Sequence, residues 1–105
     1  MRSDMFCAFS FIGENFTILF LRGECDLATV AELEQACDRV PNDRRLIIDA
    51  FDLDFIDCGS VRVLARLAGR LPAVEVVARG VSPMQAKLLS LTTIEVLDPA
   101  LRLSS

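Results

Sequence analysis

The residues best suited to chemistry stand together in the segment Asp57-Cys58-Gly59-Ser60, which follows the apolar pair Phe55-Ile56. A helical pattern begins directly after this segment, so we expect a helix N-terminus fed by a strand or loop. The first turn of a helix has free N–H groups and a partial positive charge, and it therefore favours anions. The sequence places the functional site within a few residues of Cys58.

Each side chain of this segment allows more than one interpretation. Cys58 is either a redox-sensitive thiol, because a helix N-terminus activates thiols, or a small residue in a tight turn. Ser60 is either a phosphate acceptor or part of the first helical turn. Asp57 contacts a partner, caps the helix, or does both.

The composition excludes several kinds of catalytic site. The 105 residues include no His and four Cys, none of them in a C-x-x-C pair. This removes the common zinc sites and the Ser–His and Cys–His nucleophile pairs. An acidic series invites a metal or phospho-aspartate site, but no Lys stands at the late-strand position that receiver domains use. The series comprises Asp49, Asp52, Asp54 and Asp57.

Charge and hydropathy limit the partners. The net charge is −4, and Arg44-Arg45 is the main basic cluster, so nucleic acid is not an expected partner. No apolar run approaches the roughly 20 residues of a membrane span, and the N-terminus lacks the pattern of a signal peptide. We therefore expect a complete or nearly complete cytoplasmic protein with free thiols, without membrane insertion.

The elements that position the segment alternate between strands and helices. A β-hairpin is expected from strands over 6–12 and 16–21, with a turn at Gly13-Glu14 and both faces of the second strand covered. Further strands are expected over 46–48, 74–78 and 94–97, and an acidic loop over 49–54. Helices are expected from Thr29 to Pro41, from Cys58 to Pro72, and after Pro83, followed by a tail over 98–105.

The resulting order β-β-α-β-α-β-α-β predicts an α/β fold in a single domain over 1–105. Its central sheet is mixed but mostly parallel, with an N-terminal β-hairpin and helices packed against it. Two capping boxes are predicted, one from Thr29 with Glu32 and one from Ser82 with Gln85. The exposed edge of the hairpin makes a homodimer an open alternative.

Two helix faces carry further expectations. Residues at helical spacing in the last helix are expected to face inward, namely Met84, Leu88 and Leu91. The middle helix carries basic residues at i, i+4 spacing, which form either a solvated face or a row that faces a partner. These residues are Arg62, Arg66 and Arg70.

Three segments resemble, in order and spacing, the motifs of STAS domains, the fold of bacterial anti-sigma factor antagonists and of the cytoplasmic tails of sulfate transporters. Residues 22–29 are similar to the family's G-E-(I/L)-D-L-x-T segment at the first helix. Residues 48–64 are similar to its strand, loop and F-I-D-S-S-G-L-x-x-L segment, and residues 81–92 to S-P-x-x-x-x-L-L-x-L-T. The matches run over about 6–97.

The resemblance implies a binding module rather than an enzyme, without cofactor. In the family, the unphosphorylated domain binds an anti-sigma factor that is also a serine kinase, and this releases a sigma factor for transcription. The kinase phosphorylates the first Ser of D-S-S-G and so ejects the antagonist. The implied contact residues lie in two segments, Asp57, Cys58, Gly59, Ser60, Val61 and Arg62 in one and Glu24, Asp26 and Thr29 in the other.

The sequence departs from the family at the acceptor. Cys58-Gly59-Ser60 replaces Ser-Ser-Gly, so Cys58 occupies the acceptor position, and Ser60 is the candidate substitute acceptor. Two alternatives keep the fold and change the role: a STAS subunit bound to a lipid-transport ATPase, and a redox-sensing variant that uses Cys58.

Overall fold

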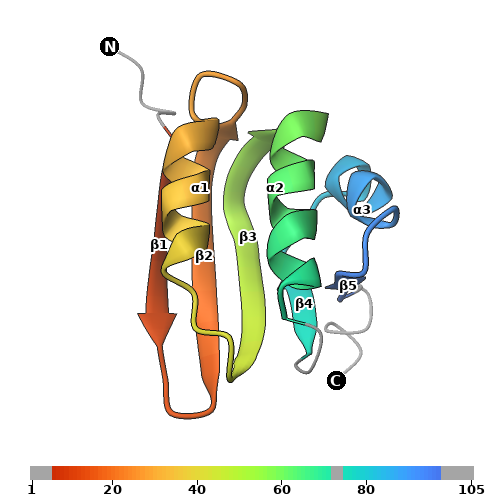
Figure 1. Cartoon of the computed structure of the whole chain (residues 1–105). Coiled ribbons are helices and arrows are strands. Elements are labelled where there is room, and N and C mark those ends of the chain that lie inside the picture. The colour runs from red at the N-terminus through yellow and green to blue at the C-terminus, as the bar shows by residue number, and fades with distance from the viewer. Residues whose placement is uncertain (1–5, 72–74, 98–105) are drawn as a thin grey trace.

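A computed structural model describes residues 6–71 and 75–97, and the element order of this part is the predicted one. The strands and helices are β1 (Cys7–Ile12), β2 (Phe16–Cys25), α1 (Val30–Asp38), β3 (Arg45–Ile56), α2 (Cys58–Gly69), β4 (Val76–Arg79), α3 (Pro83–Leu89) and β5 (Glu95–Val96). They form one five-stranded sheet in the order β1-β2-β3-β4-β5 (Figure 1). β1 and β2 are antiparallel and the other pairs are parallel, which confirms the mixed α/β fold.

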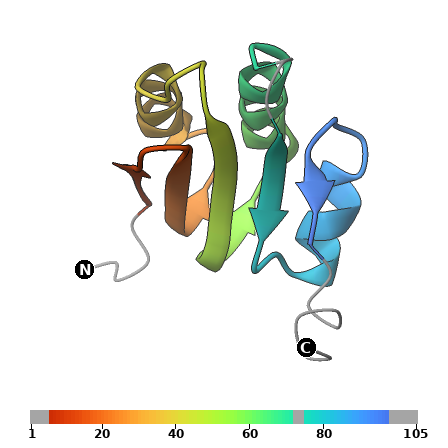
Figure 2. The ribbon, with the colours of Figure 1, turned by 90° about the horizontal axis from the view of Figure 1, so that it is seen from below.

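Helices α1 and α2 cover one face of this sheet (Figure 2). Leu19 and Leu21 of β2 point to this face and are almost fully buried, as are Leu33 of α1 and Leu64 of α2. Such a core forms where the apolar side of a strand with alternating residues packs against the apolar stripes of helices. The opposite face of β2 was expected to be covered as well. In the described chain its residues Phe16, Ile18 and Phe20 are only half-buried, so that expectation is wrong.

The expected acidic loop over 49–54 is instead the second half of β3, a strand of 12 residues. Pairing with β2 continues to Ile56, with register shifts between Phe20 and Arg22 and between Gly23 and Glu24. Within this stretch Asp49 is buried and accepts from Arg79 Nε at 3.0 Å. β2 pairs with this stretch and makes it a strand, which the sequence of the stretch alone did not indicate.

Helix α3 begins with the predicted capping box. Ser82 Oγ accepts from the N–H of Gln85 at 3.1 Å, and Gln85 Oε1 accepts from the N–H of Ser82 at 2.9 Å. The expected inward face is wrong for two of its three residues, because Met84 is 72% and Leu91 87% exposed. Leu88 is partly buried and packs against the core, as expected. Gln85 and Leu89 are the buried residues of the helix.

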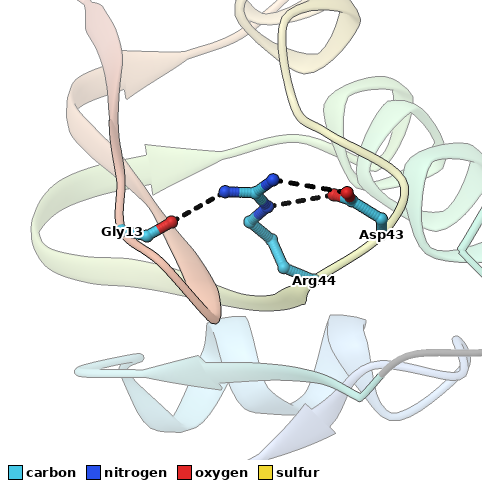
Figure 3. A network of polar contacts seen from close by, with 3 residues as sticks. All are labelled: Gly13, Asp43 and Arg44. Atoms are coloured by element: carbon cyan, nitrogen blue, oxygen red, sulfur yellow. Dashed lines mark hydrogen bonds and ion pairs between the residues drawn. The ribbon is translucent and has the colours of Figure 1, made fainter.

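The sequence also misplaced the hairpin turn by one residue. The N–H of Gly13 donates to Phe16 O at 2.8 Å, so Glu14 and Asn15 are the central residues. Figure 3 shows how this turn is tied to the loop before β3. Arg44 Nη1 donates to Gly13 O at 2.8 Å, while its Nε donates to Asp43 at 3.0 Å.

Three expectations lie outside the described residues: Val74 as the first residue of its strand, Pro72 as the end of α2, and the tail over 98–105. Among the described helices none has the length and apolar character needed to cross a bilayer.

Candidate functional site

The two segments predicted to form the site lie side by side. Because β2 and β3 are parallel neighbours, their carboxyl ends meet at one edge of the sheet, and Cys25 pairs with Ile56 there. The backbone N–H of Asp57 donates to Cys25 O at 3.1 Å, which joins the loop after β2 to the start of α2. Both segments stand at the same end of the molecule in Figure 1.

Asp57 is the N-cap of α2. Its backbone is extended (φ −95°, ψ 174°), and Oδ1 accepts from the N–H of Ser60 at 2.8 Å. The carboxylate thus satisfies one of the free N–H groups of the first turn, as a capping Asp does. The side chain is half-buried, and the helix begins at Cys58 as predicted.

The first turn of α2 divides into an outer and an inner side. Cys58, Gly59 and Arg62 are exposed, and Arg62 has no hydrogen-bond or ionic partner within the described chain. Ser60 and Val61 were expected to contact a partner but are only 0% and 7% exposed. Their side chains pack into the core and so present little surface to a partner.

Ser60 is enclosed beneath the helix start. Its Oγ has no hydrogen-bond partner among the described residues, and it lies beside the thiol of Cys25. Burial raises the pKa of Cys25 to about 11, while the neighbouring Ser60 hydroxyl opposes the shift. Both groups are therefore neutral parts of the core, and Ser60 is not presented to a kinase in this conformation.

The loop after β2 is held by its own polar side chains. Thr29 Oγ1 donates to Glu24 O at 3.0 Å and accepts from the N–H of Asp26 at 3.0 Å. Asp26 Oδ1 accepts from the N–H of Ala28 at 3.0 Å. Thr29 makes no side-chain cap to α1, so the capping box expected with Glu32 is absent. The side chain instead fixes the loop that borders the site.

The fixed loop presents Leu27, which is 86% exposed and which the sequence did not single out. Leu27 borders an open hollow of about 220 Å³ between α1 and the start of α2. The hollow is lined by Leu27, Val30, Glu34, Asp57, Gly59, Ser60, Arg62, Val63 and Arg66. We give the name α2 N-terminal surface to the exposed or half-buried residues at this hollow and the exposed thiol next to it, namely Leu27, Asp57, Gly59, Arg62 and Cys58. The motif G-E-C-D-L-A-T was the available signal for Leu27.

The basic row of α2 has two separate roles in the structure. Arg66 pairs with Glu34 of α1 at 3.4 Å, and Arg70 donates to Cys37 O of α1 at 2.7 Å. Arg62 alone of the three projects from the α2 N-terminal surface without such a contact. Arg66 and Arg70 therefore join α1 to α2 and remain exposed to solvent, as the solvated-face alternative predicts.

The acidic series does not converge on one site. Asp49 is engaged by Arg79, while Asp57 is committed to its cap, and Asp52 and Asp54 are exposed on β3. No group of three or more His, Cys, Asp or Glu in the described residues has the arrangement of a metal site. The exposed chemistry of the site consists of one thiol, a capping carboxylate, a guanidinium and an apolar side chain.

A family model described as "Mlab, STAS domain" matches residues 12–101. Curated proteins give no match. Among solved structures, an anti-sigma factor antagonist from Mycobacterium paratuberculosis has a TM-score of 0.66 and 24% identity, with 97% of this chain and 96% of that chain covered.

The anti-sigma factor antagonist SpoIIAA is similar to this chain in both its unphosphorylated and its phosphorylated form. Its unphosphorylated form has a TM-score of 0.66 and 18% identity, covering 95% of this chain and 94% of that chain. The phosphorylated form of the Bacillus protein has a TM-score of 0.61 and 15% identity, with coverage of 95% and 97%. At these identities the likeness establishes a common fold.

Proposed function

Because the chain belongs to the STAS domain family, we propose that it is a regulatory binding module that sequesters an anti-sigma factor of the serine-kinase type. Such sequestration releases a sigma factor and promotes transcription. The proposed contact is the α2 N-terminal surface together with the loop that carries Glu24, Asp26 and Thr29. We infer that the protein works in the cytoplasm as a single domain over 1–105, without enzymatic activity, metal or cofactor.

The observation that carries the proposal is the exposure of position 58 on the first turn of α2. This is the position at which the family carries its phospho-acceptor. A phosphate there adds about −1.5 to −2 charges at pH 7. Next to the carboxylate of Asp57, that charge would repel an acidic partner surface without any change of fold.

The thiol at this position removes the usual switch. Cys58 cannot accept phosphate in the Ser reaction, and Ser60 Oγ is buried beneath the helix start. A kinase would have to unwind the first turn of α2 before it reached Ser60. We therefore propose a constitutive antagonist, whose binding persists in the presence of kinase and ATP.

The proposal is tested by pull-down with each anti-sigma kinase encoded in the same genome. We expect wild-type protein to bind one of them, and Arg62→Glu to weaken binding at least tenfold because it reverses an exposed charge on the contact surface. Lys87→Glu makes the same charge change on exposed α3 and should bind normally. Failure of wild-type protein to bind any of these kinases would refute the proposal.

The switch itself is tested by incubation with the bound kinase and ATP, followed by mass spectrometry of the 57–62 peptide. We expect no phosphate on wild-type protein and continued binding. Cys58→Ser restores the family acceptor, so it should become phosphorylated at position 58 and lose binding. Phosphate on Ser60 of the wild-type protein would contradict the constitutive mechanism.

A second candidate function is a STAS subunit bound to a lipid-transport ATPase. The replaced acceptor favours this role, because a permanent subunit needs no phospho-switch. Co-purification with such an ATPase, and not with a kinase, would support it. In the redox alternative Cys58 should be alkylated well ahead of Cys7, although both thiols are exposed; equal rates would count against it.

A further inference from the structure

Within its described residues, the β1 edge of the sheet lacks the charge, Pro and bulge that usually protect an edge strand. In the described chain β1 pairs with β2 only, and it stands at the end of the strand order. Its sequence, CAFSFI, contains no charged residue and no Pro, and its register with β2 runs without a bulge. Natural sheets usually shield such edges with charge, Pro or a bulge.

The direction of the free backbone groups follows from the hairpin. The Gly13–Phe16 bond identifies a hydrogen-bonded pair, and such pairs alternate along an antiparallel ladder. Continuing the register from Ile12↔Thr17 to Cys7↔Arg22, the N–H and C=O groups of Cys7, Phe9 and Phe11 point to β2. Those of Ala8, Ser10 and Ile12 therefore point outward.

The side chains along this edge are apolar on the sheet face that lacks α1 and α2. Phe9 is 51% exposed although it stacks on Phe20 at 5.0 Å, and Phe11 is 55% exposed beside Phe16. The C-terminal end of β1 is anchored, because Arg44 Nη1 donates to the carbonyl of Gly13 at 2.8 Å (Figure 3). The edge is thus an ordered template rather than a loose segment.

We propose that β1 pairs with β1 of a second copy of this chain across a two-fold axis. Identical strands related by such an axis are antiparallel, so Ala8, Ser10 and Ile12 of each copy can exchange backbone hydrogen bonds. An axis perpendicular to the sheet keeps the aromatic residues of both copies on one face and the helices on the other. The contact is self-complementary and closes at two copies.

The size of this contact sets the expected affinity. Aromatic side chains carry roughly 150–250 Å² of surface, so half exposure leaves on the order of 100 Å² on each of Phe9 and Phe11. With Ile12 and the backbone edge, the paired strands approach the lower limit of about 1,000–1,200 Å² for specific interfaces. We expect a reversible dimer with a dissociation constant on the order of 10–100 μM.

Pairing through β1 leaves the α2 N-terminal surface free, because that surface is formed by the loop before α1 and the start of α2, and these helices cover the sheet face opposite the aromatic residues (Figure 2). The dimer is therefore independent of the proposed function. It would present two copies of that surface to partners.

The test is sedimentation velocity of the full chain from about 2 to 300 μM. Wild-type protein should shift from monomer to dimer, with no larger species. Ser10→Pro removes an outward N–H without removing a β1–β2 bond, a position where edge strands tolerate Pro. It should remain monomeric throughout. Leu27→Asp, on the other face, should dimerise like the wild type.

Two further measurements keep the result decisive. Circular dichroism and urea unfolding should show that Ser10→Pro is folded; if it is not, Phe11→Lys places a charge on the same edge and should also be monomeric. A wild-type protein that stays monomeric at every concentration would overturn the proposal. So would a folded Ser10→Pro or Phe11→Lys that dimerises normally, or a wild type that forms open-ended oligomers.

Discussion

At the scale of single residues, Asp57 caps α2, which is one of the two roles that the sequence suggested for it. Its Oδ1 accepts from the N–H of Ser60 at 2.8 Å, yet the side chain is only half-buried beside exposed Cys58. The capping carboxylate uses only one of its acceptor positions, so the others and its negative charge remain available at the rim of the site. One residue can therefore stabilise α2 and meet a partner.

Variants of Asp57 separate the contribution of its capping hydrogen bond from that of its charge. Asp57→Ala removes the cap and should lower the free energy of unfolding by about 1 kcal/mol. Asp57→Asn keeps a capping acceptor and removes the charge, so its stability should stay within a few tenths of a kcal/mol of the wild type. Urea denaturation measures both. Equal losses for the two variants would show that charge, rather than the hydrogen bond, stabilises the helix start.

The sequence placed the candidate site at the start of α2 but did not give the orientation of every side chain there. The cap at Asp57 was predictable because capping depends on residues three apart. The sequence left Ser60 as either an acceptor or part of the first turn, because its burial involves Cys25, which lies 35 positions earlier in the chain. Helical spacing of Ser60 with Leu64, Leu67 and Leu71 was a local signal for that burial.

At the scale of elements, α3 is attached to the sheet through a polar residue. Gln85 is 5% exposed, and its Nε2 donates to Leu53 O of β3 at 3.1 Å while its Oε1 completes the capping box. Apolar periodicity cannot reveal a buried amide whose partner is a distant carbonyl. The expected inward residues Met84 and Leu91 consequently proved exposed.

Neighbouring substitutions on α3 test this attachment. Gln85→Leu leaves the carbonyl of Leu53 and the N–H of Ser82 without their partner, and we expect a loss of roughly 1–3 kcal/mol in the free energy of unfolding. Met84→Ala, one residue away on the exposed side, should change it by less than about 0.5 kcal/mol. Chemical denaturation of both variants checks the pair. A larger loss for Met84→Ala would contradict the observed orientation of α3.

Helices α1 and α2 are joined at one end by Arg70. Its Nη2 donates to Cys37 O at 2.7 Å and its Nη1 to Asn42 Oδ1 at 2.9 Å. The first bond satisfies a carbonyl in the last turn of α1, which has no basic residue of its own there.

Arg70→Leu should therefore destabilise the protein by about 1 kcal/mol, since a hydrogen bond to a charged group is lost from a partly buried carbonyl. Arg62→Leu removes an arginine of the same helix that has no partner within the described chain, and it should be near neutral. Thermal or urea unfolding distinguishes them. Equal effects would mean that the contacts of Arg70 with α1 contribute nothing beyond its charge.

The order of the elements was predictable because it depends on local periodicity, but the length of β3 was not. The mixture of acidic and apolar residues over 49–54 is typical of a loop or of a strand with one solvent-exposed face. Pairing of β2 with Asp52, Leu53 and Phe55 decides for the strand, and the register shifts in β2 accommodate it. Such pairing is non-local, so the sequence of β3 alone could not show it.

At the scale of the whole molecule, the titratable groups give the chain an unusual pH profile. The sequence has no His and no Tyr, so few side chains change charge between about pH 6 and pH 9. The two buried thiols titrate above that range. Burial raises the pKa of Cys25 to about 11 and that of Cys37 to about 12, in the latter case against the opposing charge of Arg70.

The sign of the pH dependence follows from these two pKa values. An unfolded thiol loses its proton near pH 8.5–9, whereas the folded protein holds the protons of Cys25 and Cys37 to about pH 11 and 12. Between these limits the unfolded state binds fewer protons, so the free energy of unfolding falls as pH rises. This contribution is fully present below about pH 8.5 and is lost progressively up to about pH 12.

Urea denaturation at intervals from pH 6 to pH 11 tests this expectation for the molecule as a whole. We expect a nearly constant midpoint to about pH 8.5 and a steady decline above it. Cys37→Ala should be less stable at pH 7 because of the lost packing, but its decline should be shallower, since one buried thiol no longer titrates. Cys7→Ser replaces an exposed cysteine and leaves both buried thiols in place, so it should keep the wild-type slope. If Cys37→Ala kept that slope too, the alkaline loss would have to arise from groups other than the buried thiols.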